Sequence, residues 1–99
     1  MDTELLDLIH PGEILREEFM APLGLSTNAL ALALRVPATR IGEIVREQRS
    51  ITPATALRLA RYFGTTPDLW LGLQIEYELR LVRREIGGQV EMEVQPRVA

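Results

Sequence analysis

Residues 25–49 constrain the fold more than any other part of this 99-residue chain. Their sequence, LSTNALALALRVPATRIGEIVREQR, is typical of two short helices joined by a tight turn. Ala31 provides the small side chain that a close helix crossing requires, and the turn around Pro37 redirects the chain. This pattern predicts a helix-turn-helix, a motif that lays its second helix in the major groove of DNA.

The second of these helices has one apolar face. With a step of about 100° per residue, Ile41, Ile44 and Val45 point inward and leave polar side chains outside. The first residues of such a helix usually reach the base edges. We therefore expect base contacts from Ala38, Thr39, Arg40 and Glu43. The alternative is that Arg40, Glu43 and Arg46 only pair along a solvated helix face.

Charge is distributed unevenly along the chain. The net charge is −3, yet residues 35–63 hold six arginines against two glutamates and carry +4. Because salt confines the influence of a charge to about 8–10 Å, a local basic zone can bind phosphate in an acidic chain. We predict phosphate contacts from Ser26, Thr27, Arg35, Arg46, Arg49 and Thr52. For Ser26 and Thr52, helix capping alone is the alternative.

Prolines, glycines and capping residues divide the chain into five helices. They predict helices that begin near residues 11, 26, 37, 52 and 67, the last one ending at Gly87-Gly88. In the fourth helix, Leu57, Ala60 and Phe63 are the expected apolar residues. We expect an N-terminal extension (1–10), an all-α DNA-binding domain (11–86) and a tail (87–99). The alternation in the tail predicts a mobile segment or a strand paired with a second copy.

The fifth helix, residues 67–86, carries two apolar stripes. One stripe holds Trp70, Leu73, Tyr77 and Leu81 and can close the core of the domain. The second stripe is expected to bury itself in a homodimer interface made by Leu71, Ile75, Leu79, Val82 and Ile86. The alternative is that both stripes belong to the core of a small bundle.

Several classes of function have no support in the sequence. The chain lacks cysteine, and His10 is its only histidine, so we expect no metal site, no cofactor, no small-molecule substrate and no enzyme activity. The longest apolar run, residues 29–34, is far shorter than the ~20 residues of a membrane span. The acidic N-terminus is unlike a secretory signal, so we expect a cytoplasmic protein.

Several motifs in order resemble the HigA antitoxin family. They are HPGEIL at residues 10–15, LGLS at 23–26, IGEIV at 41–45, TALRLARYFGT at 55–65 and LWL at 69–71. The resemblance covers about residues 10–86 and implies a lambda-repressor-like domain of five helices. It also implies a bacterial, cytoplasmic dimer that represses its own operon and neutralises a HigB-like ribonuclease toxin. A stand-alone repressor and a pure protein-interaction module are the alternatives.

The resemblance has two further consequences. Family members usually have glycine where Arg35 stands, which predicts a left-handed turn residue at a cost of about 1–2 kcal/mol. They tend to read Asn-Gly-Lys-Arg where this chain has residues 46–49, REQR. Ribonuclease toxins of this kind are basic, so we expect the toxin to contact the acidic face formed by Glu13, Glu17 and Glu18. The alternative is that this face is only solvated.

Overall fold

Helices make up all the regular structure in residues 8–98, the part of the chain that the computed structural model describes. The first helical stretch starts as α2 (Pro11–Ile14) and continues through a π-helical η1 (Leu15–Met20) and a 3-10 turn η2 (Ala21–Leu23). It is followed by α3 (Thr27–Leu34), α4 (Ala38–Val45), α5 (Pro53–Phe63) and α6 (Pro67–Glu93). The predicted all-α fold of five helices is confirmed. Most of the predicted extension, residues 1–7, lies outside the described residues.

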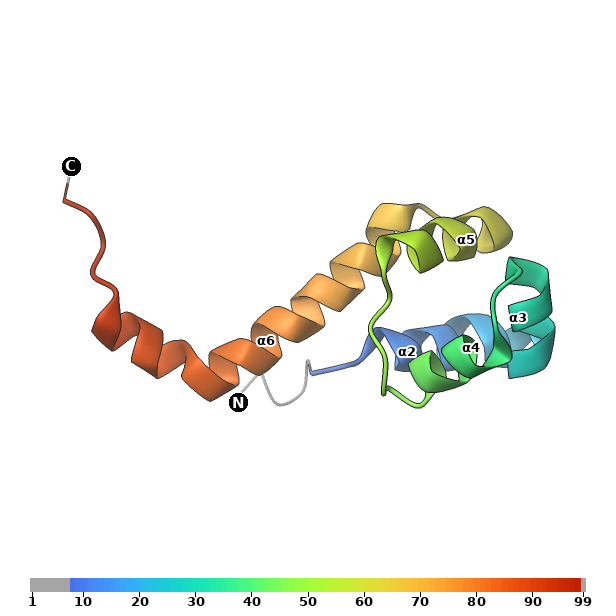
Figure 1. Cartoon of the computed structure of the whole chain (residues 1–99), viewed down its shortest axis with the longest axis horizontal. Coiled ribbons are helices and arrows are strands. Elements are labelled where there is room, and N and C mark those ends of the chain that lie inside the picture. The colour runs from blue at the N-terminus through green and yellow to red at the C-terminus, as the bar shows by residue number, and fades with distance from the viewer. Residues whose placement is uncertain (1–7, 99) are drawn as a thin grey trace.

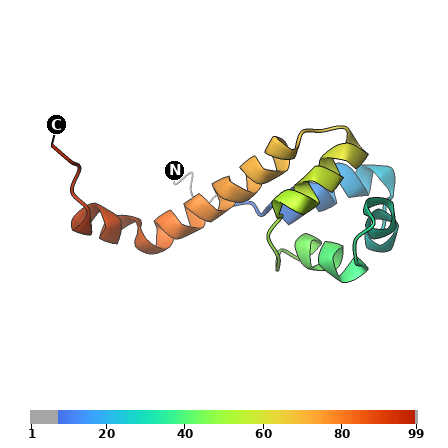
Figure 2. The same ribbon diagram turned by 45° about the horizontal axis from the view of Figure 1, so that its top comes forward.

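The bundle forms from the first four helical stretches, and α6 extends away from it (Figure 1). The turned view in Figure 2 shows the same separation between the bundle and the far end of α6. Within residues 8–98, no helix combines the length and the apolar character needed to cross a membrane.

The helix starts follow the capping residues of the sequence. Ser26, Thr52 and Thr66 each accept, through the side-chain hydroxyl, the backbone N–H three residues later, at 3.1 to 3.4 Å. Such caps satisfy amides that have no partner within the helix. Gly64, in the left-handed conformation, ends α5. The helix starts predicted near residues 26, 52 and 67 are confirmed.

The core of the bundle lies where α2, α3, α4, α5 and the start of α6 meet. Ala31 is buried in α3, which packs against α4, as its small size predicts. Trp70 is fully buried, and its indole N–H donates to the hydroxyl of Thr65 at 2.9 Å. The large or medium apolar side chains buried with them are Leu15, Met20, Leu30, Leu34, Ile41, Ile44, Ile51 and Leu59.

Of the three apolar residues expected in α5, Leu57 does not face the core. Leu57 is 61% exposed, whereas Ala56, Leu59 and Ala60 are buried and Phe63 packs against the core. Residues 56, 59, 60 and 63 follow the i, i+3, i+4, i+7 spacing of one helix face, and residue 57 falls outside it. Leu57 is therefore a surface residue.

The predicted end of α6 is also wrong. Gly87 and Gly88 lie inside the helix, which continues to Glu93, and residues 94–98 form no strand. Adding residues to an existing helix costs far less than nucleating one, so two glycines at about 1 kcal/mol each do not stop it. The amide of Gln89 donates to Glu93 at 3.2 Å and supports the last turn. Figure 1 shows α6 changing direction between its orange and red parts.

One apolar stripe of α6 is uncovered. Ile75, Leu79, Val82 and Ile86 are between 43% and 55% exposed, and Val90 lies one turn further on with 44% exposed. Leu71 differs from them because it is half-buried against the core. The alternative that both stripes are buried in the bundle is therefore wrong.

His10 caps α2 in its neutral form. Its Nδ1 accepts the N–H of Gly12 at 2.9 Å, and its ring packs edge-on against Tyr77 of α6, with centroids 4.9 Å apart. Burial lowers the pKa of His10 from its ordinary value of 6.5, although the negative charge of Glu47 opposes the shift. The only histidine of the chain therefore has a structural role at the helix start.

We expect acid to destabilise the protein through His10. Because its folded-state pKa is lowered, the unfolded chain binds more protons once the pH falls below about 6.5, so stability decreases there. The urea midpoint of the wild type should fall between pH 7.5 and pH 5.5 by more than that of His10→Asn. Asparagine keeps a capping side chain but does not titrate. Equal pH dependence in the two proteins would contradict the assignment.

Candidate nucleic-acid interface

The turn between α3 and α4 is built on a left-handed residue. Arg35 has φ 60° and ψ 44°, and the chain is held by hydrogen bonds from Arg35 N–H to Leu32 O (3.2 Å) and from Val36 N–H to Ala31 O (3.0 Å). The two bonds satisfy carbonyls at the end of α3. The left-handed conformation expected for Arg35 is confirmed, and it sets the angle at which α4 leaves the turn.

Replacing Arg35 with glycine should stabilise the fold by about 1 kcal/mol, because glycine has no Cβ to clash in this conformation. Thermal or urea unfolding measures the gain. Arg35→Ala is the matched control, since alanine also loses the arginine side chain but retains the strain. If Arg35→Gly were no more stable than Arg35→Ala, the turn would not be strained.

The outer face of α4 begins with three accessible side chains. Ala38 and Thr39 are exposed, and Arg40 is partly exposed and makes no hydrogen bond or ion pair with residues 8–98. Ile41 and Ile44 are fully buried, so the inward face is as predicted. The start of α4 therefore offers a methyl group, a hydroxyl and an unpaired guanidinium, which can recognise bases in the major groove.

Glu43 does not pair at i,i+3 spacing with its helix neighbours. Its carboxylate accepts from Nε of Arg49 at 2.9 Å, in the loop after α4. Arg46 donates instead to the side chain of Gln48 at 3.4 Å. The alternative in which Arg40, Glu43 and Arg46 pair along the helix is therefore wrong.

Gly42 makes room for an arginine. It is buried, and a Cβ built on it would lie 3.0 Å from Nη1 of Arg46, whose guanidinium lies over the helix at that point. The glycine thus lets Arg46 lie close to the backbone of α4.

The loop after α4 is held by its own backbone conformation and by hydrogen bonds to α6. Glu47 has φ 64°, a second left-handed position occupied by a residue with a side chain. Gln74 of α6, which is buried, accepts the N–H of Ile51 at 2.8 Å and donates to Ser50 at 3.3 Å. The loop that carries Arg49 to the start of α5 is therefore attached to α6.

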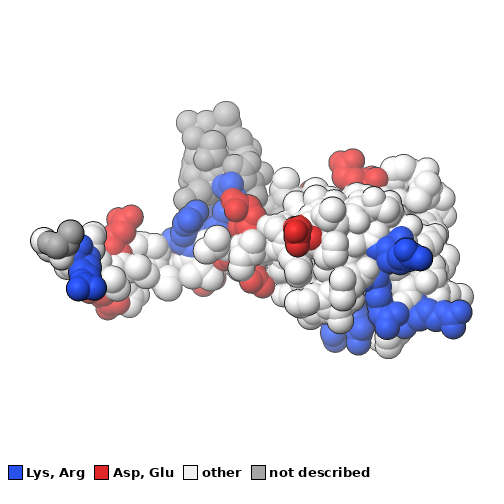
Figure 3. Space-filling view, turned by 90° about the horizontal axis from the view of Figure 1, so that it is seen from above, with Lys and Arg blue, Asp and Glu red and all other residues white. Residues whose placement is uncertain are grey.

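The predicted phosphate-binding residues fall into three groups, one of which is Thr27 alone, half-buried at the start of α3. The hydroxyls of Ser26 and Thr52 serve as helix caps, as the alternative for them predicts. Arg35, Arg46 and Arg49 have exposed side chains. Figure 3 shows arginine side chains gathered at one end of the globular part, while acidic side chains lie elsewhere on that face.

One residue of the site, Arg16, has no signal in the sequence. Arg16 of η1 donates through Nη1 to the carbonyl oxygen of Val45, the last residue of α4, and its Nη2 lies 3.7 Å from the carboxylate of Glu47. Its Nε donates to Glu17 at 3.0 Å, and this hydrogen bond raises the pKa of Arg16. Arg16 thus ties the first helical stretch to the end of α4, and no local pattern indicates a partner 29 residues away.

The acidic residues of the first helical stretch are accessible to different degrees. Glu17 and Glu18 are exposed, and Glu13 is half-buried. Because Glu17 is paired with Arg16, only part of this acidic face carries uncompensated charge.

Known proteins match this architecture closely. The helix-turn-helix family HTH_3 matches residues 15–70. Among solved structures, the antitoxin HigA of Pseudomonas aeruginosa with the higBA promoter is 48% identical, with a TM-score of 0.88 over 91% of this chain and 98% of that one. An addiction-module antidote protein of the HigA family from Coxiella burnetii is 47% identical, with a TM-score of 0.86 over 90% and 97%.

A curated relative, virulence-associated protein I of Dichelobacter nodosus, is 58% identical over 77 residues, which are 78% of this chain and 71% of the relative. The family match spans more than half of the chain, and the HigA likeness extends over nearly the whole of both solved structures. The chain therefore belongs to the helix-turn-helix family HTH_3 and, within it, to the HigA antitoxins.

Proposed function

We propose that the chain is an antitoxin that binds operator DNA as a homodimer, represses its own operon and neutralises a HigB-like ribonuclease toxin. The observation that carries the DNA-binding part is the accessible start of α4 at Ala38, Thr39 and Arg40, a helix that the exposed Arg35 and Arg46 flank in sequence. The similar HigA of Pseudomonas aeruginosa was solved with promoter DNA, which supports the same role for this surface.

In this proposal α4 lies in the major groove. Ala38 contacts a thymine methyl group, Thr39 bonds to a base edge and Arg40 binds a guanine. Glu43 accepts from a cytosine amino group. Arg35, Arg46 and Arg49, together with the first turns of α3 and α5 at Thr27 and Thr52, hold the phosphates on either side.

The dimer is proposed on α6. One helix-turn-helix reads only a short half-site, and two half-sites are spaced by about 34 Å, so a dimer is needed for a specific operator. The uncovered stripe of α6 is apolar over several turns, which favours burial against a second copy. The residues proposed for the interface are Leu71, Ile75, Leu79, Val82 and Ile86.

The toxin contact is proposed on the first helical stretch. Glu13, Glu17 and Glu18 give it an acidic face, and a basic ribonuclease would associate faster with such a face. The family consists of antitoxins and DNA-binding regulators rather than enzymes. Accordingly, no catalytic step is assigned to this chain.

Footprinting on the DNA upstream of the gene tests the DNA-binding part. The wild type should protect two half-sites about one helical turn apart, and its affinity should fall steeply with salt. Absence of protection at 50 mM salt would exclude an operator-binding role and leave an interaction module.

Co-expression tests the antitoxin part. The chain should restore growth to cells that express the small basic protein encoded beside it, and replacing Glu13, Glu17 and Glu18 with glutamine should weaken the rescue. A chain that protects its operator but rescues no neighbouring toxin would be a stand-alone repressor.

A further inference from the structure

A groove between the end of α3 and the outer face of α5 carries three arginines. It has a volume of about 410 Å³, and no acidic side chain lines it. The residues that matter for its chemistry are Leu34, Arg35, Leu57, Arg58, Arg61 and Tyr62. Leu57 is 61% exposed and Tyr62 is 45% exposed, so the groove combines positive charge with apolar surface.

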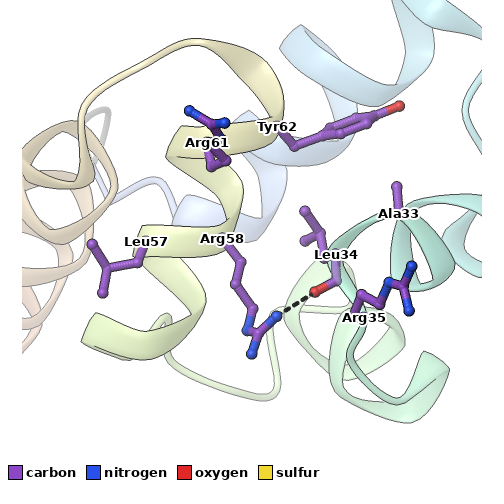
Figure 4. Close-up of a pocket in the computed structure, with 7 residues that line it drawn as sticks. All are labelled: Ala33, Leu34, Arg35, Leu57, Arg58, Arg61 and Tyr62. Atoms are coloured by element: carbon purple, nitrogen blue, oxygen red, sulfur yellow. Dashed lines mark hydrogen bonds between the residues drawn. The ribbon is translucent and has the colours of Figure 1, made fainter.

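All three arginines have unused donors. Figure 4 shows Arg58 reaching across from α5 to α3, where its Nη1 donates to the carbonyl of Leu34 at 2.9 Å. That single bond leaves most of its N–H groups available. Arg61, one turn further along α5, makes no hydrogen bond or ion pair with residues 8–98. The groove thus presents guanidinium groups in position to bind an anion.

We propose that this arginine-lined groove of the protein binds the phosphate backbone of DNA. The strand it contacts is the one across the major groove from the strand whose phosphate is held at the start of α3. The inference rests on the proposed operator binding. A helix of eight residues, such as α3, is about 12 Å long, close to the width of the major groove. In the proposed arrangement α3 lies across the major groove, so that Ser26 and Thr27 face one strand while Arg35 and the arginine-lined groove beside it face the other.

Two observations favour DNA over an acidic protein segment as the occupant. Arg35 precedes Ala38 by three residues, so the groove adjoins the end of α4 proposed to read bases. Figure 3 also shows arginine side chains gathered at one end of the globular part, where an extended polyanion can contact several of them. Because the guanidinium fork matches phosphate oxygens, each arginine can make a bidentate contact.

Arg61→Gln tests the inference, since Arg61 has no structural partner to lose among residues 8–98. The slope of log Kd against log salt concentration should become shallower by about 0.9 for the one lost phosphate contact. The loss of affinity between 50 mM and 200 mM salt should then be about 3.5-fold smaller than for the wild type. The weakening should be the same on the operator and on an unrelated duplex, because phosphates carry no sequence information.

Two further variants keep the test specific. Arg61→Lys retains the charge and should retain most of the slope. Arg97→Gln makes the same change of charge at an exposed position beyond α6 and should leave the slope unchanged. Arg58→Gln should reduce the slope as Arg61→Gln does. Because this variant also loses the hydrogen bond to Leu34, urea unfolding checks that it is folded under the binding conditions.

The outcomes separate the two proposals. If the wild type binds the operator and Arg61→Gln has the same salt dependence of Kd, the groove does not contact DNA. The proposed function then remains supported. If Arg61→Gln keeps the salt dependence of the wild type but loses binding to a poly-glutamate peptide, the groove binds an acidic protein segment instead of DNA. If the wild type fails to bind the upstream DNA, both proposals are overturned.

Discussion

Gly12→Ala is expected to lower the free energy of unfolding by about 3 kcal/mol, at the upper end of what overpacking costs. A Cβ on residue 12 would lie 1.8 Å from the carbonyl oxygen and 2.8 Å from the carbonyl carbon of Ile44. Both atoms belong to the backbone of α4, so a side-chain rotation cannot relieve the clash. The first helical stretch and α4 would have to move apart. Urea unfolding monitored by the fluorescence of Trp70 measures the loss.

Gly72→Ala is the matched control for this substitution. Gly72 lies in α6, and a methyl group added there would meet nothing within 4 Å beyond its chain neighbours and the adjacent backbone of its own helix. Alanine should therefore stabilise the protein by up to about 1 kcal/mol through helix propensity. If Gly12→Ala were as stable as the wild type, the close approach of the two helices would not be required for folding.

The double substitution Thr39→Ala/Arg40→Ala should raise Kd for the operator about 100-fold, since each base contact contributes about 1–3 kcal/mol of discrimination. The fold should remain intact, because Thr39 is exposed and Arg40 has no partner in the described part of the chain. Footprinting and gel-shift titration measure the effect, and circular dichroism checks the helix content.

Binding to unrelated DNA provides the control for this double variant. It should weaken much less than operator binding, since phosphate contacts from other residues persist. Unchanged protection of the operator would remove α4 from the role of reading helix.

Local rules predicted most of the helix starts. Ser26, Thr52 and Thr66 act within three residues of their own position, so sequence alone shows both partners of each cap. The turn at Arg35 was also predictable, in this case from the resemblance to a family with glycine there. Local patterning therefore indicated α3, α4 and their buried residues correctly.

Contacts between distant residues could not be predicted in this way. The bond from Arg16 to Val45 and the groove between Arg35 and Arg61 depend on how helices pack, which no short pattern records. The helix end predicted at Gly87-Gly88 was wrong because the low helix propensity of two glycines costs less than the continuation of a long helix gains. In α5, Leu57 misled because apolar type alone does not determine which helix face is buried.

The length of α6 has a consequence for how the protein responds to dilution. From Val82 to its end at Glu93, every residue of the helix except Gly87 is exposed. A helical segment of this length is only marginally stable in water by itself. Its amide hydrogens should therefore exchange with solvent readily in a monomer and slowly in a dimer that covers the stripe. With the proposed dimer, helix formation in α6 and self-association would be linked equilibria, so the protein concentration in the cell would determine how much of this helix is ordered and protected from proteolysis.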